Sequence, residues 1–360
     1  MPRDSGRFAG ALLHRSQWLA AGFHPRDLAS DRFTTVFPGY HTLTVHPATV
    51  NAMAWVLQNR VQRGSVLSHT TAALLWGVPL PWRLEDGVGL LRRPDLPTRE
   101  GVPLIPAVLP DRSLAAGAKL PMLHCRVERG GSAGVSRGAV VHRCRGGEIA
   151  RVGGLIVSSP GDTLRELATL MPLWDVVAAI EAVVGPQTTT ARTTLPALSE
   201  VIAEAHRRAG APRLRAALDL ARMSVRSPGE TVMRLLLDAV GFPSATPNLP
   251  VRDPVSNQLR EIDLAWEAVG LGLEYDGEGH RLTKEQWRED EARREELASY
   301  GWTLVRANGD DLWRPLRLLL RLRRTAQRHG LAVPSEERIR EGLRDVARRQ
   351  LSLRIRGPRP

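Results

Sequence analysis

Apolar and polar positions follow two different periods in the last third of the chain, and these periods predict its elements. Apolar residues recur at helical spacing over 232–240, after a start at Ser227-Pro228 with a serine cap and a proline at the first helical position. The segments that follow are predicted as three strands, a helix and a last strand, at residues 248–252, 259–265, 271–276, 283–301 and 302–306. The expected element order is therefore α, β, β, β, α, β.

The front of the chain predicts smaller elements. Residues 10–58 read as short helices followed by a hairpin, with Ser16 as the expected cap of the first helix. A helix, helix, wing order is typical of a small winged DNA-binding domain, and a packing module without DNA contacts fits the same pattern. Residues 59–186 contain helices and short segments separated by glycine and proline, which predict a mixed α+β domain.

The predicted fold class is α+β, multidomain, because 360 residues are too many for one ordinary core. The expected parts are a winged-helix-like domain, an α+β domain, a helical connector, an αβββαβ domain and an Arg-rich tail, at residues 1–58, 59–186, 187–222, 223–326 and 327–360. No apolar run approaches the roughly 20 residues that span a bilayer, and no export segment follows the first residues. We therefore expect a cytoplasmic protein with no membrane partner.

Positive charge is concentrated near the C-terminus. The formal net charge is +12, and residues 314–360 contain fourteen arginines against four acidic residues. This concentration of positive charge favours binding of a polyanion such as a nucleic acid, because each phosphate that the protein neutralises releases counterions. Arg321, Arg323 and Arg324 lie in this region and are predicted to contact DNA. A GC-rich genome would explain the preference for arginine over lysine, although it would not explain the clustering.

The two cysteines raise the question of a zinc site. Cys125 follows His124, and Cys144 lies two residues after His142, so a Cys2His2 set is conceivable. Strand alternation argues against it, because the adjacent His124 and Cys125 point to opposite faces of an extended segment. We expect two reduced cysteines instead, as is usual in the cytoplasm.

Acidic side chains lie at strand-like spacing on two successive apolar segments. Asp263 stands in the first segment, and Glu274 and Asp276 stand two residues apart in the second. If the two strands pair, these carboxylates converge on one face. Their mutual repulsion and lost hydration would be offset by a hard divalent ion. The pattern predicts a metal site for phosphodiester hydrolysis, although Asp276-Gly277 also fits ordinary turn chemistry.

The same region resembles the PD-(D/E)XK nuclease superfamily, over about Ser227 to Trp313. More closely, it is similar to relatives of the very-short-patch-repair endonuclease found in actinobacterial proteins. The residues that carry the resemblance are Ser227, Glu230, Asp263, Glu274, Asp276, Gly277, His280, Gly301, Trp302 and Arg306. The resemblance implies a restriction-endonuclease-like domain. One departure is Asp276, which stands where the superfamily usually has a lysine.

The resemblance also implies roles. Asp263 would be the central ligand of Mg²⁺ or Mn²⁺, Glu274 or Asp276 the second ligand, and Glu230 would approach from the first helix. Glu230 also fits a simple capping box. His280 would act as base or proton shuttle, because imidazole titrates near neutrality, and a surface histidine is the alternative. The arginines implied to grip phosphates are Arg293, Arg294 and Arg306.

The front half has a resemblance of its own. The segments at residues 14–22, 37–40 and 64–77 look like AbiEi-type antitoxin proteins, which are transcriptional repressors with an N-terminal winged helix. Two hypotheses follow. The first is a metal-dependent DNA endonuclease acting in DNA repair or defence. The second is a non-catalytic DNA-binding regulator of the antitoxin type. DNA is the expected partner in both, together with a toxin or repair protein, and the subunit number stays open.

Overall fold

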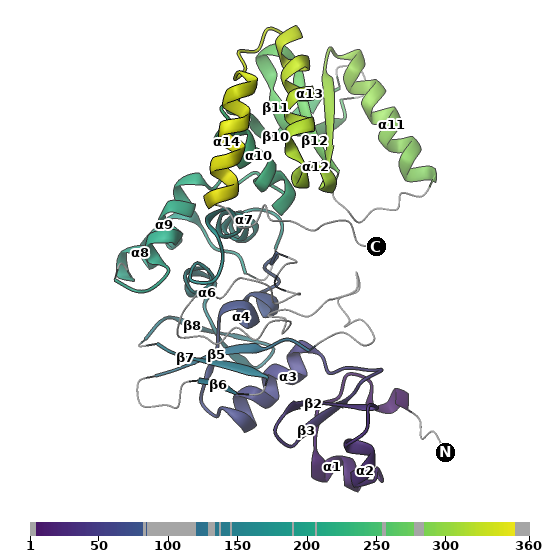
Figure 1. The fold of residues 1–360 in the computed structure, drawn as a ribbon, viewed down its shortest axis with the longest axis vertical. Coiled ribbons are helices and arrows are strands. Elements are labelled where there is room, and N and C mark those ends of the chain that lie inside the picture. The colour runs from purple at the N-terminus through teal and green to yellow at the C-terminus, as the bar shows by residue number, and fades with distance from the viewer. Residues whose placement is uncertain are drawn as a thin grey trace. The chain divides into compact units, whose positions relative to one another are not determined.

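A computed structural model of the chain shows mixed α+β architecture with several sheets (Figure 1). It describes residues 5–81, 84, 120–128, 134–136, 138–144, 146–188, 191–205, 207–253, 257–276 and 284–349. The chain divides into two compact units, one of Met1–Met171 with Thr190–Arg215 and one of Pro172–Thr189 with Ala216–Pro360. In the described part of the chain, no helix combines the length and apolar character needed to cross a membrane.

The first unit begins with a three-stranded antiparallel sheet in the order β1-β3-β2. Its elements are β1 (Leu13–His14), α1 (Arg15–Ala20), α2 (Pro25–Leu28), β2 (Phe33–Phe37) and β3 (Tyr40–Leu43). Their core contains Trp18 and Phe33, whose rings meet edge to face. The cap of α1 is His14 rather than the expected Ser16, because the His14 ring accepts the Ser16 N–H and Gln17 reaches back to the His14 N–H.

A six-stranded mixed sheet follows in the order β6-β7-β5-β4-β9-β8. Its strands are β4 (Val66–Leu67), β5 (Leu123–Val127), β6 (Gly134–Ser136), β7 (Ala139–Arg143), β8 (Ile149–Val152) and β9 (Leu155–Ser158). The pairs β5–β7 and β4–β9 are parallel. The helices of this unit are α3 (Val50–Val56), α4 (His69–Trp76), α6 (Pro160–Leu167) and α8 (Leu195–Glu204), while α9 (Ala211–Leu220) spans the boundary to the second unit. Helix α4 packs on β5 and α6.

The second unit contains a four-stranded sheet in the order β10-β11-β12-β13. Its elements are α10 (Pro228–Val240), β10 (Thr246–Arg252), β11 (Leu259–Trp266), β12 (Leu271–Asp276), α11 (Lys284–Ser299) and β13 (Thr303–Asn308). The predicted order α, β, β, β, α, β is confirmed. The first three strands are antiparallel and β13 pairs in parallel with β12. Helix α11 covers the sheet through Leu297, which packs with Ile262 and Ala265.

Helix α10 is fixed at both ends by local sequence. Ser227 Oγ accepts the Glu230 N–H at its start, and Gly241 ends it at a left-handed φ of 93°. Its inner face packs on α7 (Leu173–Val184), where the buried Arg234 and Glu181 form an ion pair of 2.6 Å. Burial raises the pKa of Glu181, and the charge of Arg234 opposes that rise. The sequence placed α7 in the middle domain, and the structure groups it with α10.

Three helices follow the sheet: α12 (Gly309–Trp313), α13 (Pro315–Arg328) and α14 (Glu336–Arg349). Helix α14 packs on α10 and buries Ile339 and Val346. At Gly342 the two backbones approach so closely that an added Cβ would lie 2.9 Å from the Ala239 carbonyl oxygen. Fourteen residues of the expected tail at 327–360 therefore form a packed helix, and residues 350–360 lie outside the described part.

Candidate functional site

A polar cavity of about 180 Å³ opens in the second unit at one end of the sheet. The residues that line it come from β11, β12, α11 and β13, and they are Asp263, Glu274, Tyr275, Asp276, Arg293 and Arg306. The parallel register pairs Glu274 with Arg306, which brings a carboxylate and a guanidinium from distant segments to neighbouring strands. The cavity thus collects three carboxylates and two cations, and it has room for an ion with attached water.

The surroundings of Asp263 shift its pKa. Burial raises its pKa to about 6, and the negative charges of Glu230 and Glu274 add to the rise. The Tyr275 N–H, which donates to Asp263 Oδ2 at 2.7 Å, and the charge of Arg293 oppose it. The positive charge and hydrogen bonding around Asp263 therefore do not offset the cost of ionising it. A cation bound nearby would favour the ionised form.

Glu274 and Arg293 form an ion pair across the cavity. The Arg293 Nη2 atom lies 3.1 Å from Glu274 Oε1, and it also donates to the carbonyl oxygen of Glu261. This guanidinium links α11 to both β11 and β12. Asp276 stands at the exposed end of β12. The cavity therefore holds the positive charges of Arg293 and Arg306 together with the carboxylate of Asp276.

Glu230 lies beside the cavity and does not line it. Its side chain is buried, and Oε2 accepts hydrogen bonds from the Arg226 N–H at 3.0 Å and from Asn248 Nδ2 at 2.7 Å. The expected capping box is modified, because the carboxylate returns to Arg226, one residue before the Ser227 cap. Asn248 adopts a left-handed φ of 47°, which asparagine tolerates better than most residues. Glu230 therefore fixes the start of α10 beside β10 and acts on Asp263 through its charge.

Sequence reasoning missed the contact between Gly229 and Tyr275. A Cβ atom at Gly229 would lie 2.0 Å from the Tyr275 ring, so only glycine permits the first turn of α10 to rest on this ring. Tyr275 stands between the two acidic residues of β12. Its ring contacts α10, and its backbone holds Asp263. A glycine in the first turn of a helix and a tyrosine inside an acidic strand motif were the available signals.

The remaining predicted residues fall in three groups. His280 and Gly277 lie outside the described residues. Arg294 is half-buried on α11 and is not a lining residue. Of the arginines on α13, Arg321 and Arg324 are exposed.

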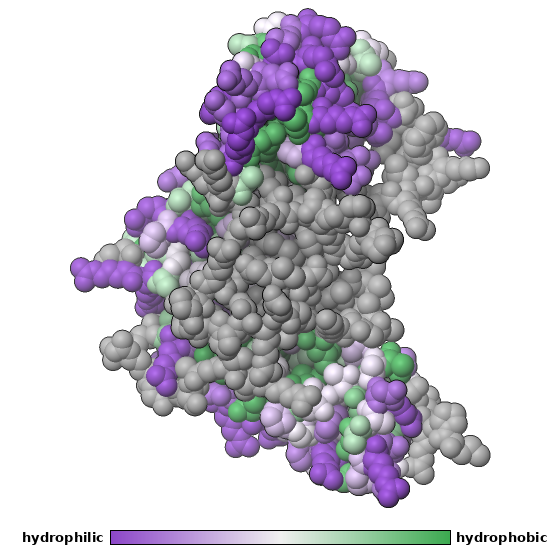
Figure 2. Space-filling model, in the orientation of Figure 1, coloured by the Kyte–Doolittle hydropathy of each residue, from purple (hydrophilic) through white to green (hydrophobic). Residues whose placement is uncertain are grey.

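The arginines of α13 also differ in what they bind. Arg321 donates to the carbonyl oxygen of Arg306, a lining residue of the cavity. Arg323 is half-buried and donates to the Pro334 carbonyl oxygen at 2.9 Å, so it holds the connection to α14. The surface over α13 and α14 is largely hydrophilic, with an apolar strip between the helices that includes Leu316 and Leu343 (Figure 2). Two other exposed arginines, Arg314 and Arg317, lie along this strip.

The cysteines behave as the sequence predicted. Cys125 is buried, Cys144 is half-buried, and no disulfide joins them. Burial raises the pKa of Cys125 to about 11, which makes it a poor metal ligand and a weak nucleophile. The neighbouring His124 and His142 do lie together, in a cluster that His69 completes and that neither cysteine joins. Cys125, Cys144, His124 and His142 therefore do not form a Cys2His2 set.

Comparisons with known proteins give limited information. Two proteins of Mycobacterium tuberculosis, one from strain CDC 1551 / Oshkosh and one from strain ATCC 25618 / H37Rv, are each 28% identical to this chain over 197 residues. The match covers 54% of this chain and 70% of each relative, and both relatives are described as uncharacterized proteins. No family model and no solved structure matches the chain.

Proposed function

We propose that the protein is a metal-dependent DNA endonuclease whose active site is the cavity of Asp263, Glu274 and Asp276. The observation that carries the proposal is the meeting of these carboxylates with Arg293 and Arg306 in one polar cavity. The αβββαβ order and the parallel last strand support a restriction-endonuclease-like domain. Metal-dependent hydrolysis of a phosphodiester uses both the carboxylates and the arginines. The carboxylate oxygens suit a hard cation, and the guanidinium groups suit phosphate.

The donor set fits Mg²⁺ or Mn²⁺. Asp263 and Glu274 would hold the ion, with Asp276 at the open end of the cavity. The oxygens of the three carboxylates do not all lie within 4.8 Å of one another, in contrast to the ligand atoms of the histidine cluster. Water molecules would complete the shell, as is usual for Mg²⁺ bound by one or two carboxylates. The ion would polarise the phosphate and lower the pKa of a bound water.

The chain's own groups have separate tasks in this site. Tyr275 holds Asp263 in place through its backbone N–H. Arg293 keeps Glu274 oriented and presents positive charge to the cavity, where it would neutralise charge that develops on the phosphate. Arg306 lines the cavity from β13, the strand next to β12. On the nearby surface, Arg321 and Arg324 would bind the DNA backbone without regard to sequence.

One observation favours a second function, that of a non-catalytic DNA-binding regulator of the antitoxin type. Arg293 already neutralises one oxygen of Glu274, so part of the negative charge in the cavity is balanced within the protein. A regulator would use the exposed arginines for DNA and would not need a bound ion. The two functions therefore differ in whether cleavage depends on a divalent metal.

Plasmid nicking separates the two functions. The wild-type protein and the isosteric variant Asp263→Asn are incubated with supercoiled DNA and Mg²⁺ or Mn²⁺. We expect metal-dependent nicking by the wild type and a loss of at least about 100-fold in the variant. Asp345→Asn on the exposed side of α14 removes the same charge and is the control, which should cleave normally. Absence of nicking with either ion, together with retained DNA binding, would favour the regulator.

A further inference from the structure

Three histidines from distant segments of the first unit meet in one cluster. His69 begins α4, His124 lies on β5 and His142 lies on β7. Each ring offers one nitrogen, and these nitrogens all lie within 4.8 Å of one another. Among the described residues, this is the group of three ligating side chains with such spacing. His69 and His124 are buried and His142 is half-buried, so the cluster lies at the edge of the core.

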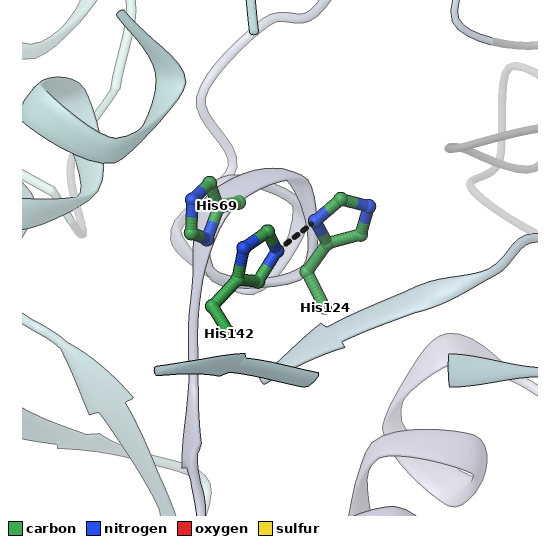
Figure 3. Close-up of side chains that lie close together, drawn as sticks. All are labelled: His69, His124 and His142. Carbon is green, nitrogen blue, oxygen red and sulfur yellow. Dashed lines mark hydrogen bonds between the residues drawn. The ribbon is translucent and has the colours of Figure 1, made fainter. Parts of the chain in front are cut away.

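The rings face one another closely. The centroids of His69 and His142 lie 3.8 Å apart in a stacked arrangement, and His124 Nδ1 lies 2.9 Å from His142 Nε2 (Figure 3). Parallel pairing of β5 and β7 explains the second contact, because it sets the two strands side by side. Three imidazoles at this distance repel each other when protonated. Burial and the nearby His142 lower the pKa of His124 well below its usual value, so this ring is neutral at physiological pH.

The protein holds this arrangement with a network behind His69. His69 has a left-handed φ of 50°, a costly conformation for a residue other than glycine. Its N–H donates to Glu166 Oε2 at 3.0 Å, and the other oxygen of Glu166 accepts from Ser158 at 3.1 Å and lies 3.3 Å from Arg126 Nε. The strained residue is therefore supported by a buried ionic network. Such strain is typical of functional positions.

We infer that His69, His124 and His142 bind a divalent transition-metal ion, Zn²⁺, through three imidazole nitrogens. Neutral imidazoles with no carboxylate among them suit zinc and disfavour Mg²⁺ or Ca²⁺. A tetrahedral ion with Zn–N bonds of about 2.0 Å needs ligand nitrogens about 3.3 Å apart. The 2.9 Å separation of His124 and His142 is within half an ångström of that value. The site is separate from the carboxylate cavity and does not depend on the proposed nuclease activity.

A further feature of the cluster fits metal binding. His69 Nδ1 lies 2.9 Å from Ser68 Oγ, and a histidine ligand commonly bonds its second nitrogen to such a group, which fixes the ring and its tautomer. His124 and His142 would bind through Nδ1 and Nε2, the two atoms that lie 2.9 Å apart. Zinc would tie α4 to both strands and leave a fourth position for water or substrate.

The test is zinc binding by the full-length protein. The protein is stripped with a chelator, dialysed and titrated with Zn²⁺ against a chromophoric chelator, and bound zinc is counted by mass spectrometry of the native protein. We expect one zinc per chain with high affinity, and a rise in Tm on addition of zinc. In His142→Phe, which keeps an aromatic ring in the stack but has no nitrogen, affinity should fall at least about 100-fold and the rise in Tm should vanish.

Two controls make the result decisive. His46→Gln removes a histidine outside the cluster, and Asp263→Asn removes the central carboxylate of the cavity in the second unit, and both should bind zinc as the wild type does. His142→Gln is measured as well, and circular dichroism shows that each variant is folded. Unchanged zinc affinity in a folded His142 variant, or no zinc bound by the wild type, would overturn the inference and leave a hydrogen-bonded stack of imidazoles.

Discussion

The backbone N–H of Tyr275 donates a 2.7 Å hydrogen bond to Oδ2 of Asp263. The bond joins β11 to β12 just beyond their pair Leu264–Leu273. A carboxylate thus continues the strand pairing that backbone groups begin. Asp263 therefore has a structural partner as well as a place in the cavity, and this dual position determines how its ionisation affects the protein.

Stability without metal should fall as pH rises through the pKa of Asp263. The folded protein holds this proton more tightly than the unfolded chain, since the pKa is raised from 3.8 to about 6. The cost of ionising Asp263 is absent below about pH 4 and complete above about pH 6. We expect Asp263→Asn to be more stable than the wild type by about 1–3 kcal/mol at pH 8, and no more stable at pH 3.5.

Urea unfolding of both proteins at the two pH values, in the presence of a chelator, measures this difference. Addition of Mg²⁺ at pH 8 should stabilise the wild type and leave Asp263→Asn unchanged, because the ion would compensate the carboxylate charge. A stability difference that is the same at both pH values would contradict the shift in pKa.

Gly229→Ala should disturb the start of α10. The added methyl group would lie 2.0 Å from the Tyr275 ring, and relief of this clash must move either the helix or β12. We expect a loss of about 1–3 kcal/mol in the free energy of unfolding. The matched test is a double-mutant cycle with Tyr275→Ala, in which Gly229→Ala should cost little because the ring is gone. Equal losses in both backgrounds would show that the ring is not the cause.

Arg293→Gln should change both the rate and the pH dependence of nicking. In the wild type, Arg293 faces Glu274, and its positive charge lowers the pKa of Asp263. The variant removes this charge. We expect a rate about 100-fold lower at pH 7, and a shift of the pH profile to higher pH, because Asp263 would ionise less readily. Arg344→Gln on the exposed side of α14 is the control. An unchanged pH profile would separate Arg293 from the ionisation of Asp263.

The arginines of α13 should divide into two kinds when they are replaced singly by glutamine. Arg321 and Arg324 are exposed, so each replacement should weaken DNA binding and reduce the slope of log affinity against log salt by about 1. Arg323 bonds the Pro334 carbonyl oxygen, so its replacement should lower thermal stability and leave the salt slope unchanged. Binding is measured by fluorescence anisotropy with a short duplex at several salt concentrations. A reduced slope for Arg323→Gln alone would reverse this assignment.

The sequence was sufficient to predict the order of the elements from α10 to β13 in the second unit. Strand alternation around Asp263 and Glu274, the cap at Ser227 and the glycine at 241 all act locally, so they could be recognised from the residues alone. The expected convergence of Asp263, Glu274 and Asp276 is matched by the cavity that all three line. The partner of Glu230 was not predictable, because Asn248 approaches it only after β10 has folded back beside α10.

The histidine cluster shows where such reasoning ends. His69 lies 55 residues before His124 in the chain, and nothing in either local motif indicates that they meet. The local signal at His124 and at His142 is only the cysteine near each of them. Their contact depends on the parallel pairing of β5 and β7, which is a property of the sheet and not of either strand.

The parallel pairing of β12 and β13 has a consequence for how the cavity forms during folding. The hairpin of β11 and β12 can close early, because its strands are joined by a short turn. Glu274 meets Arg306 only after the chain has passed through α11 and returned alongside β12. The newly synthesised chain therefore carries its carboxylates and Arg293 before it acquires Arg306, so a ribosome-bound intermediate that ends before β13 would lack the second guanidinium group of the cavity.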